Sequence, residues 1–276
     1  MKTPLVSVII TTKNEEDVLE RLLVSIQDNI YKNTEAIVVD NNSSDKTKII
    51  AKKYTDKVFD FGPERSSQRN FGAKKSNGKY LLILDADMKL SKDVIYECVV
   101  LAEGNRKIGE IVIPEESMAT NFWEKVKAFE RSFYNLEGDR DVDAARFFKR
   151  EAFLKAGGYD EAITGPEDWD LPDTIGKLGY KIGRIKSKIY HYERFTSPFK
   201  VAKKKFYYGL KSHRYLKKQK IPTISPKTVY FLRPVFYKNW KKLVLHPFLS
   251  IGMFLMLTLE LVYGGTGFFL GKILNK

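Results

Sequence analysis

Two carboxylates stand at the end of an apolar run and are separated by a single residue. Tyr80 to Leu84 are aromatic or aliphatic, and Asp85 and Asp87 follow with only Ala86 between them. A chain that turns at this point can direct one carboxylate and part of its backbone toward one divalent ion. Mg²⁺ and Mn²⁺ prefer such oxygen ligands and commonly share their coordination with substrate phosphates. The pattern indicates a metal site of this kind; the alternative is a helix cap beside a solvated acid.

The surrounding pattern predicts the elements that would hold these acids. From about Leu5 to Arg194, apolar and amphipathic runs alternate, beginning LVSVIIT, EDVLERLLVSIQDNI, EAIVVD, DKTKIIAKKY, KVFDF, SSQRNFGAKKS and YLLILDAD. Such alternation predicts an α/β fold in which helices cover a parallel sheet. In open sheets of this kind, ligands bind beyond the carboxyl ends of the strands. Asp40, Asp85 and Asp87 all fall at such ends.

Composition and local motifs exclude several classes of protein. The chain has 276 residues, of which 43% are hydrophobic and 13% aromatic, enough to bury a core and to make disorder improbable. The single cysteine, Cys98, excludes an intrachain disulfide and is expected to be a core thiol. The N-terminal apolar run is too short for a signal peptide, so we expect the N-terminal domain to stay in the cytosol. No glycine fingerprint follows the first strand, which excludes a Rossmann dehydrogenase.

Four segments of the chain, in this order, resemble the family 2 glycosyltransferases. They are SVIITTKNEEDVLERLLVSI, VVDNNSSDKT, RSSQRNFGAKKSNGKYLLILDADM and GGYDEAITGPEDWDLPDTIGKLGYKIG, and the resemblance covers roughly residues 4 to 192. It implies the GT-A nucleotide-sugar-binding fold, which is Rossmann-like and has a mostly parallel central sheet with helices on both faces. It also implies transfer of a sugar from a nucleotide donor, with Mn²⁺ or Mg²⁺ as cofactor.

The resemblance implies a set of nucleotide-sugar contacts in the first half of the chain. In this family the loop after the first strand holds the nucleoside. An acid at the end of the next strand typically accepts a hydrogen bond from the nucleobase, and a basic residue contacts the nucleotide. The chemistry of these residues is consistent with such contacts. The edge of a uracil or guanine offers hydrogen-bond donors to a carboxylate, and a diphosphate needs cations. Capping or surface solvation is the alternative for each residue. The candidates are Thr11, Asn14, Glu15, Asp40, Arg65, Arg69 and Asp85.

The resemblance also implies the metal ligands. Asp85 and Asp87 match the family's metal motif, in which the second acid usually binds the ion directly. His191, one of only three histidines, lies where some GT-A enzymes place a late histidine near the metal or the diphosphate. A structural role is the alternative for His191. We therefore expect Asp87, Asp85 and His191 to surround the Mn²⁺ or Mg²⁺ ion.

The stretch GPEDWDLPD matches the family's acceptor motif and places Asp168 as general base, with Glu167 and Asp170 as weaker candidates. A sugar hydroxyl is a poor nucleophile at neutral pH, so a carboxylate within hydrogen-bond reach must take its proton. The family's usual single displacement inverts the anomeric centre, while the metal stabilises the leaving nucleoside diphosphate. The alternative is that these acids only satisfy the first turn of a helix.

The positive charge is concentrated in one segment. The net charge is +14, and residues 196–242 hold twelve lysines, two arginines and no acid, whereas the rest of the chain is balanced. Phe199 and Phe206 lie among these lysines, as in a helix that lies in a membrane interface with its cations toward anionic lipids. A solvated basic helix is the alternative. Nucleic acid is not an expected partner, because a hydrophobic segment follows directly.

The hydrophobic segment at residues 243–274 is long enough for one spanning helix, which needs about 20 residues. Glu260 falls near its middle and YGGTG is a sequence that can break a helix, so a re-entrant hairpin is the rival to a single span. The predicted organisation is a catalytic domain at 1–194, a basic amphipathic juxtamembrane region at 195–242 and a hydrophobic membrane anchor at 243–274.

These expectations combine into an inverting, metal-dependent transferase at the cytosolic membrane face. It would move a sugar from a UDP- or GDP-sugar to a lipid-linked or glycan hydroxyl acceptor. One alternative is a polyprenyl-phosphate glycosyltransferase, whose acceptor phosphate is already an anion and needs no base. An alternative from another class is a catalytically silent scaffold that binds polyanions or membranes through its basic segment.

Overall fold

The computed structural model describes residues 3–135, 138 and 144–274. The chain divides into two compact units that exchange segments along the sequence. Unit 1 comprises residues up to Glu115, Ala144–Glu161 and Leu171–His191, and unit 2 comprises Glu116–Asp143, Ala162–Asp170 and Tyr192–Lys276. The division differs from the predicted boundary at residue 194, because two segments of the predicted catalytic domain pack with the C-terminal helices.

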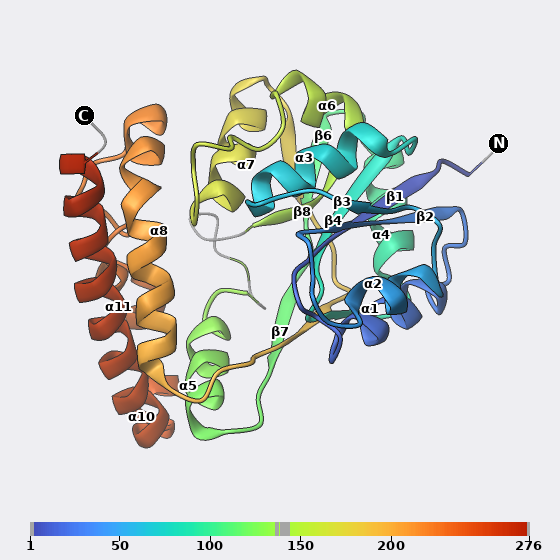
Figure 1. The fold of residues 1–276 in the computed structure, drawn as a ribbon. Helices are drawn as coiled ribbons and strands as arrows, with labels where there is room; N and C mark the ends of the chain where they lie inside the picture. The colour runs from blue at the N-terminus through green and yellow to red at the C-terminus, as the bar shows by residue number, and fades with distance from the viewer. Residues whose placement is uncertain (1–2, 136–137, 139–143, 275–276) are drawn as a thin grey trace. The chain divides into compact units, whose positions relative to one another are not determined.

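Unit 1 is built on a seven-stranded sheet of order β3-β2-β1-β4-β8-β6-β9 (Figure 1). Strand β8 is antiparallel to both of its neighbours, and the other pairs are parallel. The predicted α/β fold with a mostly parallel central sheet is therefore confirmed. The strands are β1 (Val6–Thr12), β2 (Thr34–Asp40), β3 (Val58–Asp60), β4 (Tyr80–Asp85), β6 (Ile108–Val112), β8 (Ala145–Lys149) and β9 (Lys181–Arg184).

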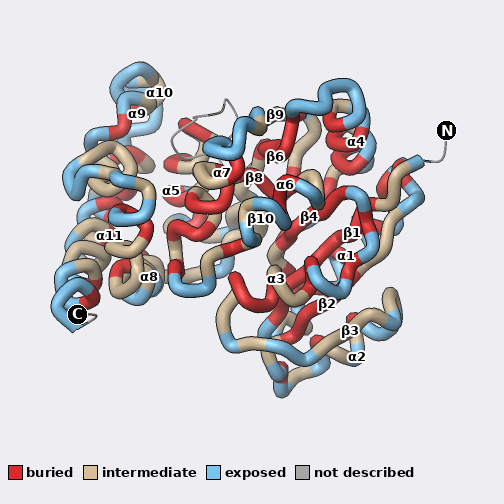
Figure 2. The backbone as a smooth tube through the Cα atoms, turned by 90° about the horizontal axis from the view of Figure 1, so that it is seen from above, coloured by how far each residue is buried: buried red, intermediate tan, exposed pale blue. Residues whose placement is uncertain are grey.

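Helices cover both faces of this sheet, as predicted. Val8 and Ile10 of β1 join one core, and Ile9 joins the other, because alternate side chains of a strand point to opposite faces. Figure 2 shows β1 and β4 as buried strands between these layers. The first core includes α1 (Leu19–Gln27), α2 (Thr47–Lys52) and α4 (Val94–Gly104), and the second includes α3 (Arg65–Lys75), α6 (Arg150–Lys155) and the later part of α7 (Glu167–Lys177).

The predicted core thiol is confirmed. Cys98 of α4 is fully buried in the first core. Burial, with a smaller contribution from the charge of Glu97, raises the pKa of the thiol well above its ordinary value. Because the thiolate is the reactive form, Cys98 is an inert part of the packing.

The carboxyl edge of the sheet collects the acids that the sequence singled out. Asp40 and Asp85 end β2 and β4, the two strands that flank β1. Directly after Asp87 the chain forms β5, which pairs antiparallel with β10 and sets His191 opposite Met88. This pairing brings His191 beside Asp87, although about a hundred residues separate them. The short strands are β5 (Met88–Leu90), β7 (Glu115–Met118) and β10 (Ile189–Tyr192).

Glu110 of unit 1 is a buried acid whose pKa is raised. Glu110 lies in the middle of β6 with 3% of its surface exposed. Burial, and to a lesser extent the charge of Asp173, raises the pKa of Glu110 to about 8. The group is therefore protonated in the folded chain at neutral pH, whereas an unfolded chain ionises it near pH 4.5.

We expect Glu110→Gln to remove a loss of stability at alkaline pH. Between pH 4.5 and 8 the folded state holds a proton that the unfolded state has released, so folding stability falls as pH rises through this window. The loss amounts to about 5 kcal/mol at most. Chemical denaturation at pH 5 and pH 9 measures it, with the exposed Glu20→Gln as control. An equal pH dependence in wild type and Glu110→Gln would contradict this assignment.

Unit 2 is helical, and α5 packs against the long C-terminal helix. Val126 and Phe129 of α5 share a core with Met253, Met256 and Leu257 of α11. The amino end of α5 is closed by a capping box between Asn121 and Glu124. The helices are α5 (Phe122–Arg131), α8 (Pro198–Gln219), η1 (Tyr230–Leu232), α9 (Pro234–Lys238), α10 (Trp240–Leu245) and α11 (Pro247–Leu274).

The acid near the middle of α11 is buried in an ion-pair cluster. Glu260 is 1% exposed, and its carboxylate lies 2.9 Å from the Lys127 ammonium and 3.4 Å from that of Lys205. Lys127 also pairs with Glu130, so α5, α8 and α11 are joined through charges. Removing one member of such a cluster leaves an uncompensated buried charge, which costs about 3–5 kcal/mol. Glu260 therefore fixes α11 against protein side chains.

The break at YGGTG that the hairpin alternative requires is absent in the described residues, because α11 is continuous from Pro247 to Leu274. Gly267 and Gly271 of α11 allow close packing against α8, and the two helices lie side by side in Figure 1. A Cβ atom at Gly267 would lie 2.2 Å from the Phe206 carbonyl oxygen, and one at Gly271 would lie 2.0 Å from that of Leu210. The re-entrant hairpin is therefore not observed. Of the helices that the structure describes, α11 alone has the length and apolar composition needed to cross a membrane.

Candidate active site

An acid at the end of β4 is held by arginines from two other elements. The Asp85 carboxylate lies 3.0 Å from the guanidinium of Arg69 on α3 and 3.4 Å from that of Arg146 on β8. The Arg69 side chain is fully buried, and its guanidinium also lies over the Tyr159 ring, 5.0 Å from the ring centroid. The structure thus fixes two cations at the carboxyl edge of the sheet.

These cations determine the protonation state of Asp85. Burial acts to raise its pKa, but the charges of Arg69 and Arg146, with smaller contributions from Arg65 and His191, hold the pKa well below its usual range. Asp85 is therefore ionised throughout the physiological range. Arg65 precedes Arg69 by one turn of α3, so both guanidinium groups act on the same carboxylate.

A second group of polar side chains surrounds the loop after β4. The His191 Nε2 atom lies 3.3 Å from the Asp87 carboxylate, and its Nδ1 atom lies 3.5 Å from that of Glu115. Arg146 donates from Nε to Glu115 and thereby connects this group to Asp85. The charges of Arg146 and His191 overcome the effect of burial and lower the pKa of Glu115. The expected neighbours Asp87 and His191 are therefore brought together.

The donor set fits a divalent cation that is shared with a substrate. Among the described residues, no group of three or more histidine, cysteine, aspartate or glutamate side chains is placed to hold an ion by itself. Asp85 faces two arginines, whereas Asp87 and His191 face each other with one carboxylate and one imidazole nitrogen. Mg²⁺ is commonly held by one or two carboxylates together with substrate phosphates. Mn²⁺ accepts the same oxygen ligands, and imidazole is a further ligand for such metals.

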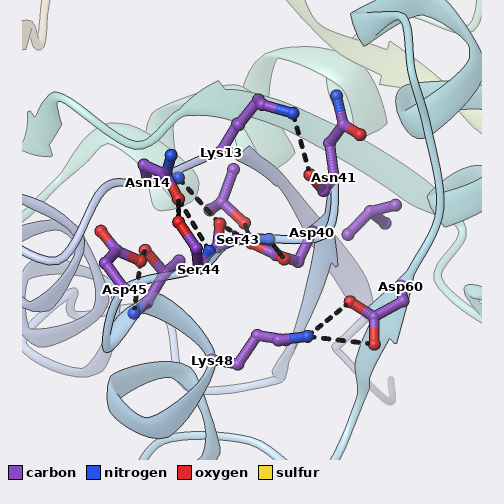
Figure 3. A network of polar contacts seen from close by, with 12 residues as sticks. Lys13, Asn14, Asp40, Asn41, Ser43, Ser44, Asp45, Lys48 and Asp60 are labelled. Atoms are coloured by element: carbon purple, nitrogen blue, oxygen red, sulfur yellow. Dashed lines mark hydrogen bonds and ion pairs between the residues drawn. The ribbon is translucent and has the colours of Figure 1, made fainter.

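The loops after β1 and β2 form a hydrogen-bonded platform next to this edge (Figure 3). Asp40 is fully buried and accepts from the Thr12 hydroxyl at 2.7 Å and from both the N–H and the hydroxyl of Ser43 at 2.6 Å. A carboxylate has roughly four acceptor positions. Hydrogen bonds from within the protein occupy three of those of Asp40. Asp40 thus holds the platform together, and the base contact expected for it stays a prediction.

The predicted nucleoside loop is connected to the same platform. Asn14 adopts a left-handed backbone with φ of 54°, donates its N–H to the Ser43 hydroxyl and accepts from the Ser44 N–H (Figure 3). The Glu15 N–H donates to the Thr47 hydroxyl at 2.7 Å. Left-handed backbone is tolerated by asparagine better than by most residues. The structure therefore brings Asn14 and Glu15 into one network with Asp40, while Thr11, 7% exposed, lies within β1.

The acids of the predicted acceptor motif lie in the first turn of α7 and differ in their surroundings. Glu167 and Asp170 are each 1% exposed, whereas Asp168 is half-buried. Asp170 accepts from the Lys218 ammonium at 2.7 Å and from the Gln219 amide at 2.6 Å, which ties α7 to the end of α8 within unit 2. Asp168 is thus the most accessible of the three carboxylates.

Sequence reasoning missed Arg146, Glu115 and Ser43. Arg146 reaches Asp85 across 61 residues and Glu115 across 31 residues, because β8 enters the sheet between β4 and β6. An arginine inside the otherwise apolar run ARFF is the one local signal that pointed to a buried charge. Ser43 lies in the quoted segment VVDNNSSDKT, but its contact with Asp40 follows from the turn geometry.

Comparison with known proteins places these residues in a family context. The family model described as Glycosyl transferase family 2 matches residues 7–156. Probable glycosyltransferase YdaM of Bacillus subtilis is 29% identical over 65% of this chain and 48% of its own length. A GalNAc(5)-diNAcBac-PP-undecaprenol beta-1,3-glucosyltransferase of Campylobacter jejuni is 33% identical over 57% of this chain and 60% of its own. The chain spans about half the length of the first of these relatives.

A further relative and two solved structures extend the likeness to the rest of the chain. An uncharacterized glycosyltransferase of Methanocaldococcus jannaschii, MJ1057, is 28% identical over 86% of this chain and 87% of its own. The mannosyltransferase PcManGT of Pyrobaculum calidifontis, solved with GDP-Man and Mn²⁺, superposes with a TM-score of 0.59 at 16% identity, over 93% of this chain and 74% of its own. TarS 1-349 of S. aureus, solved with UDP-GlcNAc, superposes with a TM-score of 0.57 at 16% identity, over 95% of this chain and 90% of its own. These structures establish the fold alone.

Proposed function

Because the chain belongs to glycosyl transferase family 2 and has the GT-A fold, we propose that it transfers a sugar from a UDP- or GDP-sugar to a hydroxyl acceptor, with inversion of the anomeric centre. One observation carries this proposal. Arg69 and Arg146 converge on Asp85 at the carboxyl edge of the sheet, beside the facing pair Asp87 and His191. Ligands of open parallel sheets bind at this edge.

The charges of this cluster suit a diphosphate. Arg65, Arg69 and Arg146 provide three cations, and Asp85, Asp87 and Glu115 provide three carboxylates, so the cluster is nearly neutral without ligand. Guanidinium groups bind phosphate oxygens through paired N–H donors. A bound diphosphate adds negative charge that the protein alone does not balance, which favours a divalent cation beside Asp87 and His191.

The platform formed by the β1 and β2 loops is proposed to hold the nucleoside. Asp40 and Ser43 fix the loop after β2, and Asn14 and Glu15 connect the loop after β1 to it. Preorganised loops bind with a smaller entropic cost, because they need not be ordered by the ligand. Asp40 acts here by positioning the platform, and Thr11 contributes from the end of β1.

The chemical step requires stabilisation of the leaving group and deprotonation of the acceptor. When bound, Mn²⁺ or Mg²⁺ stabilises the charge that develops on the nucleoside diphosphate. Arg69 and Arg146 orient the diphosphate, and Asp87 and His191 are the residues that would hold the ion. Asp168 takes the proton of the acceptor hydroxyl as the new glycosidic bond forms, and Glu167 beside it is the second candidate for this role.

The acceptor is proposed to be lipid-linked, which places the enzyme at a membrane. The Campylobacter jejuni relative is named for a substrate on undecaprenol, and α11 is long and apolar enough to cross a bilayer. The basic helix α8 packs along α11 and would face anionic lipids. We propose that the catalytic unit lies on the cytosolic side, where nucleotide sugars are available.

Calorimetric titration of the full chain with UDP and GDP, with and without Mn²⁺, tests the donor site. We expect one nucleotide to bind at least about tenfold more tightly when Mn²⁺ is present, because the cation and the arginines share the diphosphate. Tight binding of neither nucleotide, or binding that Mn²⁺ leaves unchanged, would contradict the proposed donor site.

Charge reversal on α8 is expected to weaken membrane binding. Lys203 and Lys217 are exposed, and each lysine near an anionic surface contributes about 1 kcal/mol. The Lys203→Glu, Lys217→Glu double variant should therefore partition at least about tenfold less onto vesicles that contain anionic lipid, and raised salt should weaken wild-type binding. Vesicle sedimentation measures this, with Lys52→Glu, Lys53→Glu at the carboxyl end of α2 as the matched control. An equal decrease in the control would refute a specific role for α8.

A further inference from the structure

Unit 2 contains a cavity of about 360 Å³ between α8, α11 and the residues that connect α8 to η1. Its volume lies within the range of small-molecule binding sites. Gly165 and Pro166, just before α7, and Trp169 in its first turn form part of one wall. Asp168, the proposed base, precedes Trp169 in the chain. The cavity and the first turn of α7 are thus parts of one compact unit.

The lining of this cavity is mainly aromatic and aliphatic. Trp169, Tyr215, Phe268 and Leu261 contribute apolar surface from α7, α8 and α11. Space remains here partly because Gly265 of α11 lacks a side chain, and a Cβ atom at Gly265 would meet no heavy atom within 4 Å. A cavity with these walls is suited to a hydrocarbon chain.

Two lysines place positive charge in the same lining. Lys205 pairs with Glu260 at 3.4 Å and lies over the Tyr230 ring. Lys227 donates to the Tyr215 hydroxyl at 3.3 Å, and its ammonium lies 6.0 Å from the centroid of the Tyr215 ring. An apolar cavity with a cation in its lining complements a chain that ends in an anionic group.

We propose that this cavity binds the hydrocarbon chain of the lipid-linked acceptor, with the phosphate of that lipid near Lys227. The inference rests on the proposed function in taking the lipid to be the acceptor, but the binding site itself is a separate property of unit 2. An isoprenoid or acyl chain would occupy the space beside Gly265 and Phe268. The sugar that the lipid carries would then extend from the anionic end of the chain.

Farnesyl phosphate is the probe for this site, and the full-length protein in mild detergent is the material. Gly265→Phe places a ring in the cavity, and we expect it to weaken farnesyl phosphate binding at least tenfold in equilibrium dialysis. Thr266→Phe adds the same ring one residue along α11, at an exposed position outside the lining, and should bind as wild type does. Lys227→Gln should reduce the preference for farnesyl phosphate over farnesol without abolishing the binding of farnesol.

The outcomes separate this inference from the proposed function. Wild-type affinity in Gly265→Phe, with thermal unfolding unchanged, would overturn the cavity assignment, and so would full displacement of the probe by inorganic phosphate alone. If Gly265→Phe unfolds, Gly265→Leu with its smaller side chain provides the same test. UDP and GDP binding should be equal in all these variants. If the wild-type protein binds neither UDP nor GDP, the donor site is refuted, but binding of farnesyl phosphate would still support the cavity assignment.

Discussion

Asp87→Asn is expected to lower metal-dependent turnover of the nucleotide sugar by about 100-fold or more. Asparagine keeps the size of the side chain but removes the negative charge that would hold the cation against the diphosphate. A metal acting as Lewis acid supplies several kcal/mol, and a loss of roughly 3 kcal/mol corresponds to this factor. Steady-state release of nucleoside diphosphate as a function of Mn²⁺ concentration measures the change in both kcat and the metal requirement.

The control for Asp87→Asn is Asp93→Asn, an exposed acid at the start of α4. It should leave turnover and the Mn²⁺ requirement unchanged. Because 27% of the Asp87 side chain is exposed, the asparagine variant should unfold at nearly the wild-type temperature. Retention of metal-dependent turnover in Asp87→Asn would remove this residue from the site, and the pairing with His191 would then be structural.

Asp168→Asn is expected to lower sugar transfer strongly while leaving donor binding intact. A positioned general base contributes about 10²- to 10⁴-fold to a rate, so transfer should fall by that factor. The affinity for UDP or GDP with Mn²⁺ should not change, since the arginines and Asp87 belong to unit 1. Product formation on a lipid-linked acceptor and calorimetric nucleotide binding, measured on the same preparation, give the two quantities.

Asp170→Asn distinguishes a structural acid from the proposed base in the same helix. Asp170 is buried and paired with Lys218, so its amide variant should lower the unfolding temperature. Asp168→Asn should not, because Asp168 is half-buried. Full transfer by Asp168→Asn would instead favour a phosphate acceptor, which needs no deprotonation, and hence a polyprenyl-phosphate glycosyltransferase.

Much of unit 1 could be predicted from the sequence. Strands buried on both faces give continuous apolar runs, so YLLIL and LVSVII identified central strands and located Asp85 and Asp40 at their ends. The resemblance then joined His191 to Asp87, and the structure places them 3.3 Å apart. These features depend on local pattern or on a family motif, and both can be recognised in a single amino-acid sequence.

The remaining features depend on contacts that no local pattern encodes. Arg146 meets Asp85 through the antiparallel insertion of β8, and that pairing is a property of the whole sheet. The glycines of YGGTG left a re-entrant hairpin open as the rival to a single span. In the structure the helix continues through them, and Gly267 allows α8 and α11 to approach closely. A glycine weakens an isolated helix, but a neighbouring helix that packs on it compensates for this cost.

Donor turnover tests the central claim most directly. Purified full-length protein in detergent would be supplied with UDP- and GDP-sugars and Mn²⁺ or Mg²⁺, with EDTA and Asp87→Asn as controls, and release of nucleoside diphosphate would be recorded. We predict release from the sugar nucleotides of one base, dependent on the metal and lost in the variant. Absence of release from every donor with either metal, in protein that is folded, would contradict a glycosyl transfer function and favour a silent, membrane-binding scaffold.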